Sequence, residues 1–267
     1  MTAPLNGPLD RRPTDRALVC APASDETALR GFIARILGWS DECAQAIEHA
    51  LGSVRLSTSQ RAALVLLGET DLVPIAHALH RRTIGPERPF VVCDRRRLNM
   101  PASVRSPTNL ESGVAAIQAA RGGSLCIHRI RAPKDFPSLV PLVRDPVSSV
   151  HLIVCASARD ALDPFLILPA PIRLPPLSAR VSELPRIVDE YALDAISTLG
   201  EDAAGFTDAD RTWVLDHSVG TLPEIEAATL RLVALRISLT VTGAAEMLGM
   251  SHVALSRWLL RRRAARR

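Results

Sequence analysis

The chain has 267 residues and a formal net charge of +4, with 47% hydrophobic and 22% charged residues. This composition is typical of a globular protein with one substantial core, and it excludes an intrinsically disordered chain. The three tryptophans, one tyrosine and five phenylalanines are too few for the aromatic platforms that bind single-stranded nucleic acid.

The cysteines and the apolar runs indicate where the protein works. The five cysteines lie far apart and include no CxxC pair. An odd, scattered set favours reduced thiols over a disulfide framework or a zinc site. The longest apolar runs, such as residues 62–67, are too short to span a membrane, and the first residues lack the apolar segment of a signal peptide. We therefore expect a cytoplasmic protein that does not contact a membrane.

The first part of the chain alternates between helix and strand patterns. We expect a flexible tail at 1–16 and helical segments at 17–51. Continuous apolar runs then predict buried strands at 62–67, 89–92, 124–128 and 150–155. Helices are expected between them at 71–82 and 110–121, the second capped by Asn109. This order predicts an α/β fold with a doubly wound parallel sheet. After residues 172–177 the pattern changes, and 180–236 is predicted to be helical.

Residues 240–267 predict two short helices joined by a tight turn. The first runs from about Thr242 to Leu248, and Gly249 ends it because glycine accepts the left-handed conformation that a helix end often needs. Such a pair is the layout of a helix-turn-helix, whose second helix enters the major groove of DNA.

The second of these helices has a cap and two distinct faces. Ser251 is placed to cap it by accepting a hydrogen bond from a backbone N–H. Leu255, Trp258 and Leu259 recur at helical spacing and should face the protein. The positions left outward are His252, Ser256 and Arg257.

The charge of this stretch agrees with a nucleic-acid partner. No acidic residue follows Glu246, and the arginines after it are Arg257, Arg261, Arg262, Arg263, Arg266 and Arg267. Subtracting these six charges from +4 leaves −2 on residues 1–250, so the positive excess is local, as expected of an element that contacts phosphates. The alternative is a solvated, arginine-rich end of an ordinary amphipathic helix.

Several segments, taken in order, resemble one known family. They are LGWS at 37–40, GETDLVPIAHALH at 68–80, PFVVCDRRRL at 89–98, ARGGSLCIHRI at 120–130, IRLPPLSARVSELPRIV at 172–188, GTLPEIEAATLRLVAL at 220–235 and the final helix-turn-helix. Together they are similar to the sigma-54-dependent transcription activators, the bacterial enhancer-binding proteins of the AAA+ class, which end in a Fis-type helix-turn-helix. The resemblance covers roughly residues 35–267.

The nucleotide loop of that family is not preserved. A Walker A loop needs glycines whose N–H groups cradle phosphates, a lysine for the β- and γ-phosphates, and a Ser or Thr for magnesium. Here the loop after Gly68 is two residues short; Asp71 would repel phosphate and Pro74 removes an N–H donor. Lys134, the only lysine in the chain, is distant in sequence.

The other parts of the family's ATPase site are also missing. His128 and Arg129 stand where Walker B acids would hold magnesium, and Pro223 replaces the arginine that senses the nucleotide. Residues 162–171 replace the arginine-finger segment, and the interval 98–113 is too short for the loop that touches sigma-54. The loss of all five parts predicts a chain that is not an enzyme, with no catalytic residues, no cofactor and no metal.

What the resemblance implies is a DNA-binding transcriptional regulator on an ATPase-dead scaffold. It divides the chain into a tail (1–16), a degenerate AAA+ core (17–175), a helical lid (176–236) and a Fis-type helix-turn-helix (237–267). Matched to the family's recognition helix, the DNA-binding residues are Ser251, His252, Ala254, Ser256, Arg257 and Arg261. Ser251 and Arg261 should approach phosphates. The partner is double-stranded DNA, and helix 223–236 is a candidate for forming a Fis-like dimer.

Other readings remain open from the sequence. The chain could be a pseudo-ATPase interaction subunit that modulates an active AAA+ partner, or an unrelated α/β domain with a helix-turn-helix. A working ATPase is the least favoured. His77 and His80 could bind zinc near Cys93, although ordinary histidines are the simpler account. The aspartates of the predicted helix near 207–218 are expected to be helix-start signals and solvated charges, and these are Asp208, Asp210 and Asp216.

Overall fold

The computed structural model describes residues 26–60, 62–99, 106–135, 141, 149–157, 170–200 and 205–264. In these ranges six parallel strands form one sheet in the order β3-β2-β4-β5-β1-β6. The strands are Leu64–Leu67 (β1), Phe90–Cys93 (β2), Thr108–Asn109 (β3), Ser124–His128 (β4), His151–Ala156 (β5) and Ile172–Arg173 (β6). The four expected strands and the α/β fold class are confirmed, while β3 and β6 add a short strand at each edge. The tail expected at 1–16 lies outside the described residues.

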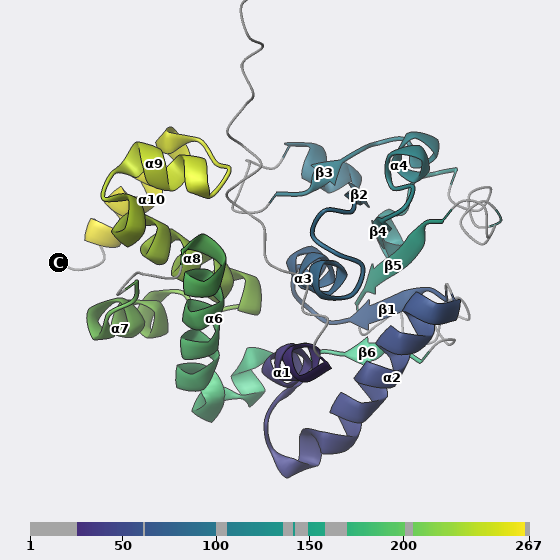
Figure 1. The fold of residues 1–267 in the computed structure, drawn as a ribbon, viewed down its shortest axis with the longest axis horizontal. Coiled ribbons are helices and arrows are strands. Elements are labelled where there is room, and N and C mark those ends of the chain that lie inside the picture. Colours follow the sequence, from purple (N-terminus) through teal and green to yellow (C-terminus); the bar gives the residue numbers. More distant parts are fainter. Residues whose placement is uncertain are drawn as a thin grey trace, which may run out of the picture.

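Helices cover both faces of the sheet, which explains the continuous apolar runs. On one face Leu66 and Val92 pack against α1 (Glu26–Leu37), α2 (Ala44–Gln60) and α3 (Val73–Thr83). On the other face Val65 and Val91 pack against α4 (Gly113–Ala119). A strand buried on both sides has no polar face to present, so its sequence does not alternate. The sheet is therefore doubly wound (Figure 1).

The predicted cap of α4 is wrong. Asn109 lies in β3, where its side-chain amide donates to the Asp94 carbonyl at 3.0 Å and accepts from the Asp94 N–H at 3.1 Å. Ser112 caps the helix instead, accepting from the Ala115 N–H at 3.4 Å. Both residue types suit a helix N-terminus, and only the pairing of β3 with β2 decides between them.

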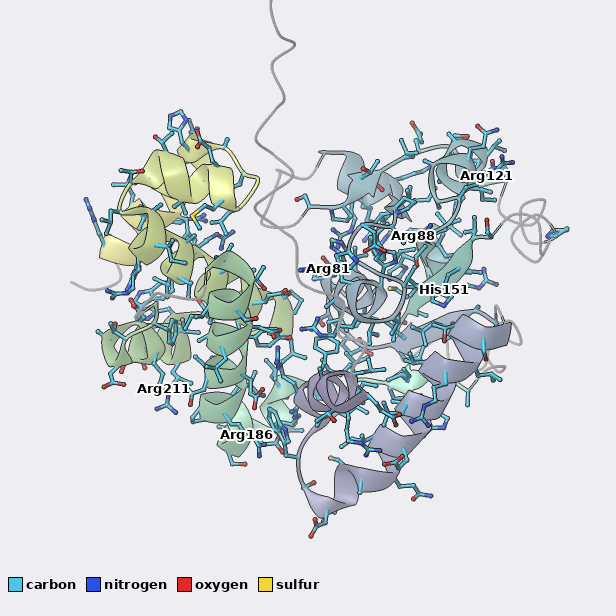
Figure 2. All side chains as sticks on the ribbon, in the orientation of Figure 1. Arg81, Arg88, Arg121, His151, Arg186 and Arg211 are labelled. Carbon is cyan, nitrogen blue, oxygen red and sulfur yellow. The ribbon has the colours of Figure 1, made fainter. Side chains whose placement is uncertain are left out.

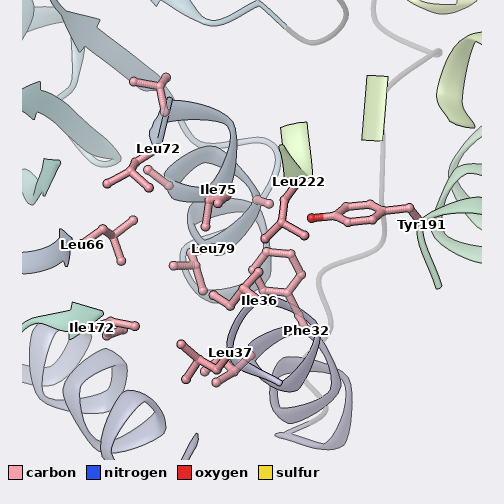
Figure 3. Close-up of a cluster of buried hydrophobic side chains, with 14 of the residues drawn as sticks. Phe32, Ile36, Leu37, Leu66, Leu72, Ile75, Leu79, Ile172, Tyr191 and Leu222 are labelled. Carbon is pink, nitrogen blue, oxygen red and sulfur yellow. The ribbon is translucent and has the colours of Figure 1, made fainter. Parts of the chain in front are cut away.

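The helices that follow the sheet share its core. They are α6 (Leu184–Leu199), α7 (Asp208–His217) and α8 (Leu222–Ser238), in the region where helices were predicted. Figure 3 shows Phe32 of α1, Tyr191 of α6 and Leu222 of α8 pointing toward one another beside the residues that pack on the sheet. The α/β part and these helices are thus joined by one continuous apolar cluster. No helix in the described part has both the length and the hydropathy that a membrane span requires.

A buried ion-pair network crosses the same boundary. Arg35 of α1, whose side chain is 6% exposed, donates to Asp194 of α6 at 2.6 Å, and Arg82 of α3 donates to the same oxygen at 2.6 Å. The Arg35 guanidinium also lies 4.8 Å from the Tyr191 ring centroid. A buried charge is tolerated when it is paired in this way, and removing the partner is costly. The network therefore fixes α6 against α1 and α3.

Two buried histidines form a polar chain at the amino ends of β4 and β5. His80 contacts the Arg88 carbonyl at 3.1 Å through Nε2 and the Ser124 hydroxyl at 2.7 Å through Nδ1. The Ser124 oxygen lies 3.3 Å from Nδ1 of His151, labelled in Figure 2, whose Nε2 contacts the Ser57 hydroxyl. The ring nitrogens of His80 are thus engaged by protein atoms, while His77 stacks on Phe90 at 4.6 Å.

Candidate nucleic-acid interface

The last two described helices are short and joined by a tight turn, in the region where a helix-turn-helix was predicted. α9 spans Val241–Met247 and α10 spans His252–Ala264, and only two residues separate α9 from the end of α8. Figure 1 shows α9 and α10 at the outer edge of the helical half, away from the strands. The sequence therefore placed both helices and the turn between them correctly to within one or two residues.

Side-chain caps and one left-handed glycine define the turn. Thr240 accepts from the Gly243 N–H at 3.1 Å to cap α9, and Ser251 accepts from the Ala254 N–H at 3.2 Å to cap α10. Gly249 has φ 63°, where a side chain would be strained. The Met250 N–H then donates to the Ala245 carbonyl at 3.0 Å, which satisfies an orphan group at the end of α9.

A small apolar cluster holds the two helices on α8. Its buried members come from four helices and are Ala195, Leu230, Val233, Ala234, Ala244, Ala245, Leu248 and Leu255. The alanines of α9 allow close approach to α8. Leu255 is the fully buried residue of α10, as expected, and Trp258 and Leu259 are half-buried.

The predicted DNA-binding residues lie on α10 with different exposure. Ser251, His252, Arg257 and Arg261 are exposed, and Ala254 and Ser256 are half-buried. Two apolar residues that were not among the predicted DNA-binding residues are also exposed on this helix, Val253 at 44% and Leu260 at 63%. Their spacing of seven, with Arg257 between them, places all three opposite the buried side of α10. The same spacing can be seen in the sequence, so the sequence alone could have identified Val253 and Leu260 as exposed positions.

One buried carboxylate anchors α10 to the neighbouring helices. Asp210 of α7 is 1% exposed and accepts hydrogen bonds at 2.6 Å from both Arg236 of α8 and Arg262 of α10. It also forms a capping box with Thr207 at the start of α7. The expectation that Asp210 is a solvated charge is therefore wrong, although its place in a helix-start signal is right. Arg262 is withdrawn from the basic surface by this pair.

The same contacts set the protonation of Asp210. Burial on its own would raise the pKa of this carboxyl group. The hydrogen bonds from Arg236, Thr207 and Arg262 outweigh burial and hold the pKa below its ordinary value. Asp210 is therefore a carboxylate at neutral pH, with each oxygen paired to one arginine.

The place where the resemblance implies a nucleotide does not fit one. The N-terminus of a helix after a strand can bind phosphate through its free N–H groups. At α3 the carboxylate of Asp71 accepts from the Val73 N–H at 3.2 Å and pairs with Arg97, so the chain supplies its own anion there. The Leu72 side chain lies over Gly68, within 3.0 Å of where a Cβ would stand. A carboxylate of the chain itself thus occupies this helix end.

The cavity beside this loop is also small. A hollow of about 150 Å³ lies between the loop at Gly68 and residues 174–178, below the roughly 300–1,000 Å³ of small-molecule sites. A larger one, about 400 Å³, lies between α3 and α8. Its lining carries both carboxylates and arginines, namely Asp71, Glu224, Glu226, Arg81, Arg97 and Arg231.

At the ends of the other strands the charges are paired internally. Asp94, directly after β2 and 1% exposed, accepts from Nη2 of Arg131 at 2.8 Å and from its Nε at 2.9 Å. His128 ends β4, and Arg129 begins the 3-10 turn after it. The aspartate at this edge is thus used by an arginine, an arrangement that leaves it unsuited to magnesium.

Magnesium-ATP is expected not to bind the full-length protein at concentrations below about 1 mM. The reason is the internal carboxylate of Asp71 at α3 together with the paired aspartate after β2. Isothermal titration calorimetry with ATP, with and without magnesium, measures this directly. Saturable binding in the micromolar range would contradict the account of this loop.

Comparisons with known proteins give only a distant structural similarity. No family model matches the chain, and no curated protein matches it in sequence. Crystal structures of NtrX from Brucella abortus in complex with ADP and with ATP are 14% identical to it, with TM-scores of 0.40, over 88% of this chain and 72% of that one. A further NtrX structure has a TM-score of 0.41 at the same identity, over 88% of this chain and 71% of that one. Similarity at this level assigns neither a family nor an activity.

Proposed function

We propose that this protein is a DNA-binding transcriptional regulator whose reading element is α9 and α10, carried on a scaffold that resembles an enhancer-binding protein without its ATPase site. The observation that carries the proposal is the capped helix-turn-helix with Arg257, Arg261 and Arg263 exposed on α10. Within residues 247–264 there is no acidic residue to oppose them. Arginine forks pair with phosphates and with guanine edges, so this helix suits the major groove.

The altered nucleotide site supports the second half of the proposal. An internal anion at α3 and a paired Asp94 replace the groups that ATP turnover needs. The buried network of Arg35, Arg82 and Asp194 ties α6 to the α/β part without any ligand. The scaffold then serves to present α10 rather than to hydrolyse nucleotide.

Self-association through α8 needs a different geometry from the one expected. In this helix, which the structure describes in full, only Glu224 and Arg236 are exposed. Its apolar residues pack against α6, α7 and α9 within one chain. Helix 223–236, expected to be a dimer helix, would thus offer a second copy only these two exposed side chains and its half-buried ones.

Arg261→Gln is expected to weaken binding of duplex DNA in a salt-dependent way. Three arginine–phosphate contacts give a log–log slope of affinity against salt near −3 for one copy, and about twice that for two copies on one site. Loss of one contact per copy should reduce the slope by about 1 per copy. Electrophoretic shift or fluorescence anisotropy at several salt concentrations measures both the slope and the copy number.

The matched control is Arg211→Gln. Arg211 is an arginine on α7 that is paired with Asp189 at 2.7 Å and lies away from α10. Figure 2 labels it at the far side of the helical half. Its removal should leave the salt slope unchanged. If the unaltered protein shifts no duplex at low salt, the proposal fails.

A further inference from the structure

Arg231 of α8 is a half-buried cation without a counter-ion among the described residues. In the described residues its side chain has no hydrogen bond and no carboxylate partner, and its Nε is shielded from solvent. Its guanidinium lies 5.3 Å from the ring centroid of Trp258, which compensates part of the charge. Burial, together with the nearby charge of Arg261, lowers the pKa of Arg231 to about 10. The Nε–H of this half-buried guanidinium has no protein acceptor, so the side chain keeps hydrogen-bonding capacity for an anion.

An open hollow begins beside this arginine and runs along the outward flank of α10. Its volume is about 560 Å³, within the roughly 300–1,000 Å³ of small-molecule sites. The walls include Arg231, Arg257, Arg261, Trp258, Met250 and Leu260. None of the described residues that line it is acidic. Arg257 and Arg261 are four residues apart, so both project from the same flank of α10.

We propose that this hollow binds a small amphipathic anion, with one phosphate, sulfonate or carboxylate group held by Arg231, Arg257 and Arg261 and an apolar body lying on Trp258. Planar guanidinium forks bind such oxyanions in pairs of hydrogen bonds. Met250 and Leu260 add apolar contact for the body of the ligand. The arginines alone would also suit a DNA phosphate. The DNA backbone has no apolar group to cover this wall, and Arg231 belongs to α8 rather than to the reading helix.

Occupation of the hollow has a consequence for DNA, which rests on the proposed function. Arg257 and Arg261 are needed both by the anion and by the duplex. A bound anion neutralises these two guanidinium groups, so ligand and DNA compete for one protein. The molecule would then release DNA as the concentration of the anion rises.

The test uses the full-length protein and 1-naphthyl phosphate, which joins one phosphate to an aromatic body. Calorimetric titration should give saturable binding, and Arg231→Gln should weaken it by about tenfold or more because a charged hydrogen-bond partner is lost. Inorganic phosphate and 1-naphthol, which each carry half of the ligand, should bind at least about tenfold more weakly. Arg211→Gln is the matched control and should bind as the unaltered protein does.

A thermal melt separates recognition from a structural role. Arg231→Gln removes a half-buried charge that has no carboxylate partner, so without ligand it should melt at the same or a higher temperature. A lower melting temperature would make Arg231 a structural residue and overturn the site. Equal affinity of both proteins for 1-naphthyl phosphate, or no saturable binding in the millimolar range, would also overturn it. Inorganic phosphate binding as tightly as 1-naphthyl phosphate would refute the apolar part.

DNA titrations distinguish this proposal from the proposed function. Addition of 1-naphthyl phosphate should release a bound duplex from the unaltered protein, at lower concentration than inorganic phosphate does. A protein that binds 1-naphthyl phosphate but no duplex would refute DNA binding and keep the anion site. A protein that binds duplex but not the anion would refute the anion site and keep DNA binding.

Discussion

Asp210→Ala is expected to lower the free energy of unfolding by about 3–5 kcal/mol, the range found when one partner of a buried ion pair is removed. The change removes the carboxylate that Arg262, whose side chain is 13% exposed, binds between α7 and α10. It also releases Arg236 and breaks the capping box with Thr207. Urea unfolding followed by circular dichroism measures the loss, and the same variant should bind DNA more weakly because α10 loses its anchor.

The control for this variant is Asp208→Ala. Asp208 is an exposed aspartate in the first turn of the same helix, two positions away. Its loss should cost less than about 1 kcal/mol, as for a surface charge near a helix N-terminus. The double change Asp210→Ala with Arg262→Met should recover part of the stability, since it also removes the half-buried charge that Asp210 neutralises. Equal costs for Asp208→Ala and Asp210→Ala would contradict the anchoring role.

Lowering the pH from about 6.5 to 4 is expected to remove about 3 kcal/mol of stability through His151 alone. Burial, with a smaller contribution from the charge of His80, lowers the pKa of His151 from 6.5 to about 4. In this window the unfolded chain takes up a proton on His151 and the folded chain does not, so acid favours unfolding. The stability is fully present above about pH 6.5. The pKa of His80 is lowered too, first by burial, and acts in the same direction.

His151→Gln should flatten the dependence of stability on pH between about 4 and 6.5. The side chains that contact His151 are Ser57 and Ser124, which do not titrate, and His80 reaches His151 through Ser124. Asp210 acts at lower pH, because its lowered pKa keeps its contribution until the pH falls through the ordinary aspartate range. His49→Gln, an exposed histidine on α2, serves as the control and should leave the slope as it is. A slope unaltered by His151→Gln would show that other groups dominate.

The hydrogen-bond chain around His151 is one hydrogen short as long as the ring is neutral, so remaining neutral has a cost. The chain from the Arg88 carbonyl through His80, Ser124, His151 and Ser57 to the Ala62 carbonyl has five contacts. Two neutral imidazoles and two hydroxyls supply one hydrogen each, one fewer than the contacts. The longest contact, 3.3 Å between Ser124 and His151, is then the one without a shared hydrogen. Burial outweighs this deficit and keeps both rings neutral.

Most of the fold followed from local patterns in the sequence. Apolar runs at β1, β2, β4 and β5 predicted the sheet because strands buried on both faces read as unbroken hydrophobic segments. Strands β3 and β6 have only two residues each, too few for any periodicity. Asn109 and Ser112 are both good caps, so the choice between them depended on strand pairing, which a single sequence does not reveal.

Only part of the candidate interface could be predicted, because only part of it depends on local patterns. Caps and the turn of α9 and α10 are local, and Ser251 and Gly249 mark them in the sequence. The anchor at Asp210 joins residues 26 and 52 positions apart, so no local pattern shows it. The hollow at Arg231 likewise depends on how α8 meets α10. Long-range pairing of charges is what the linear pattern lacks.

The position of α8 has a consequence for how the reading helices can be used. Leu230, Val233 and Ala234 of α8 supply much of the apolar cluster beneath α9 and α10. A fragment that begins after residue 236 would expose Leu248 and Leu255, with too little surface to bury for independent folding. The pair of helices α9 and α10 is therefore not an autonomous unit that could be grafted onto another protein. It is the outer layer of the helical body, and it should melt together with that body.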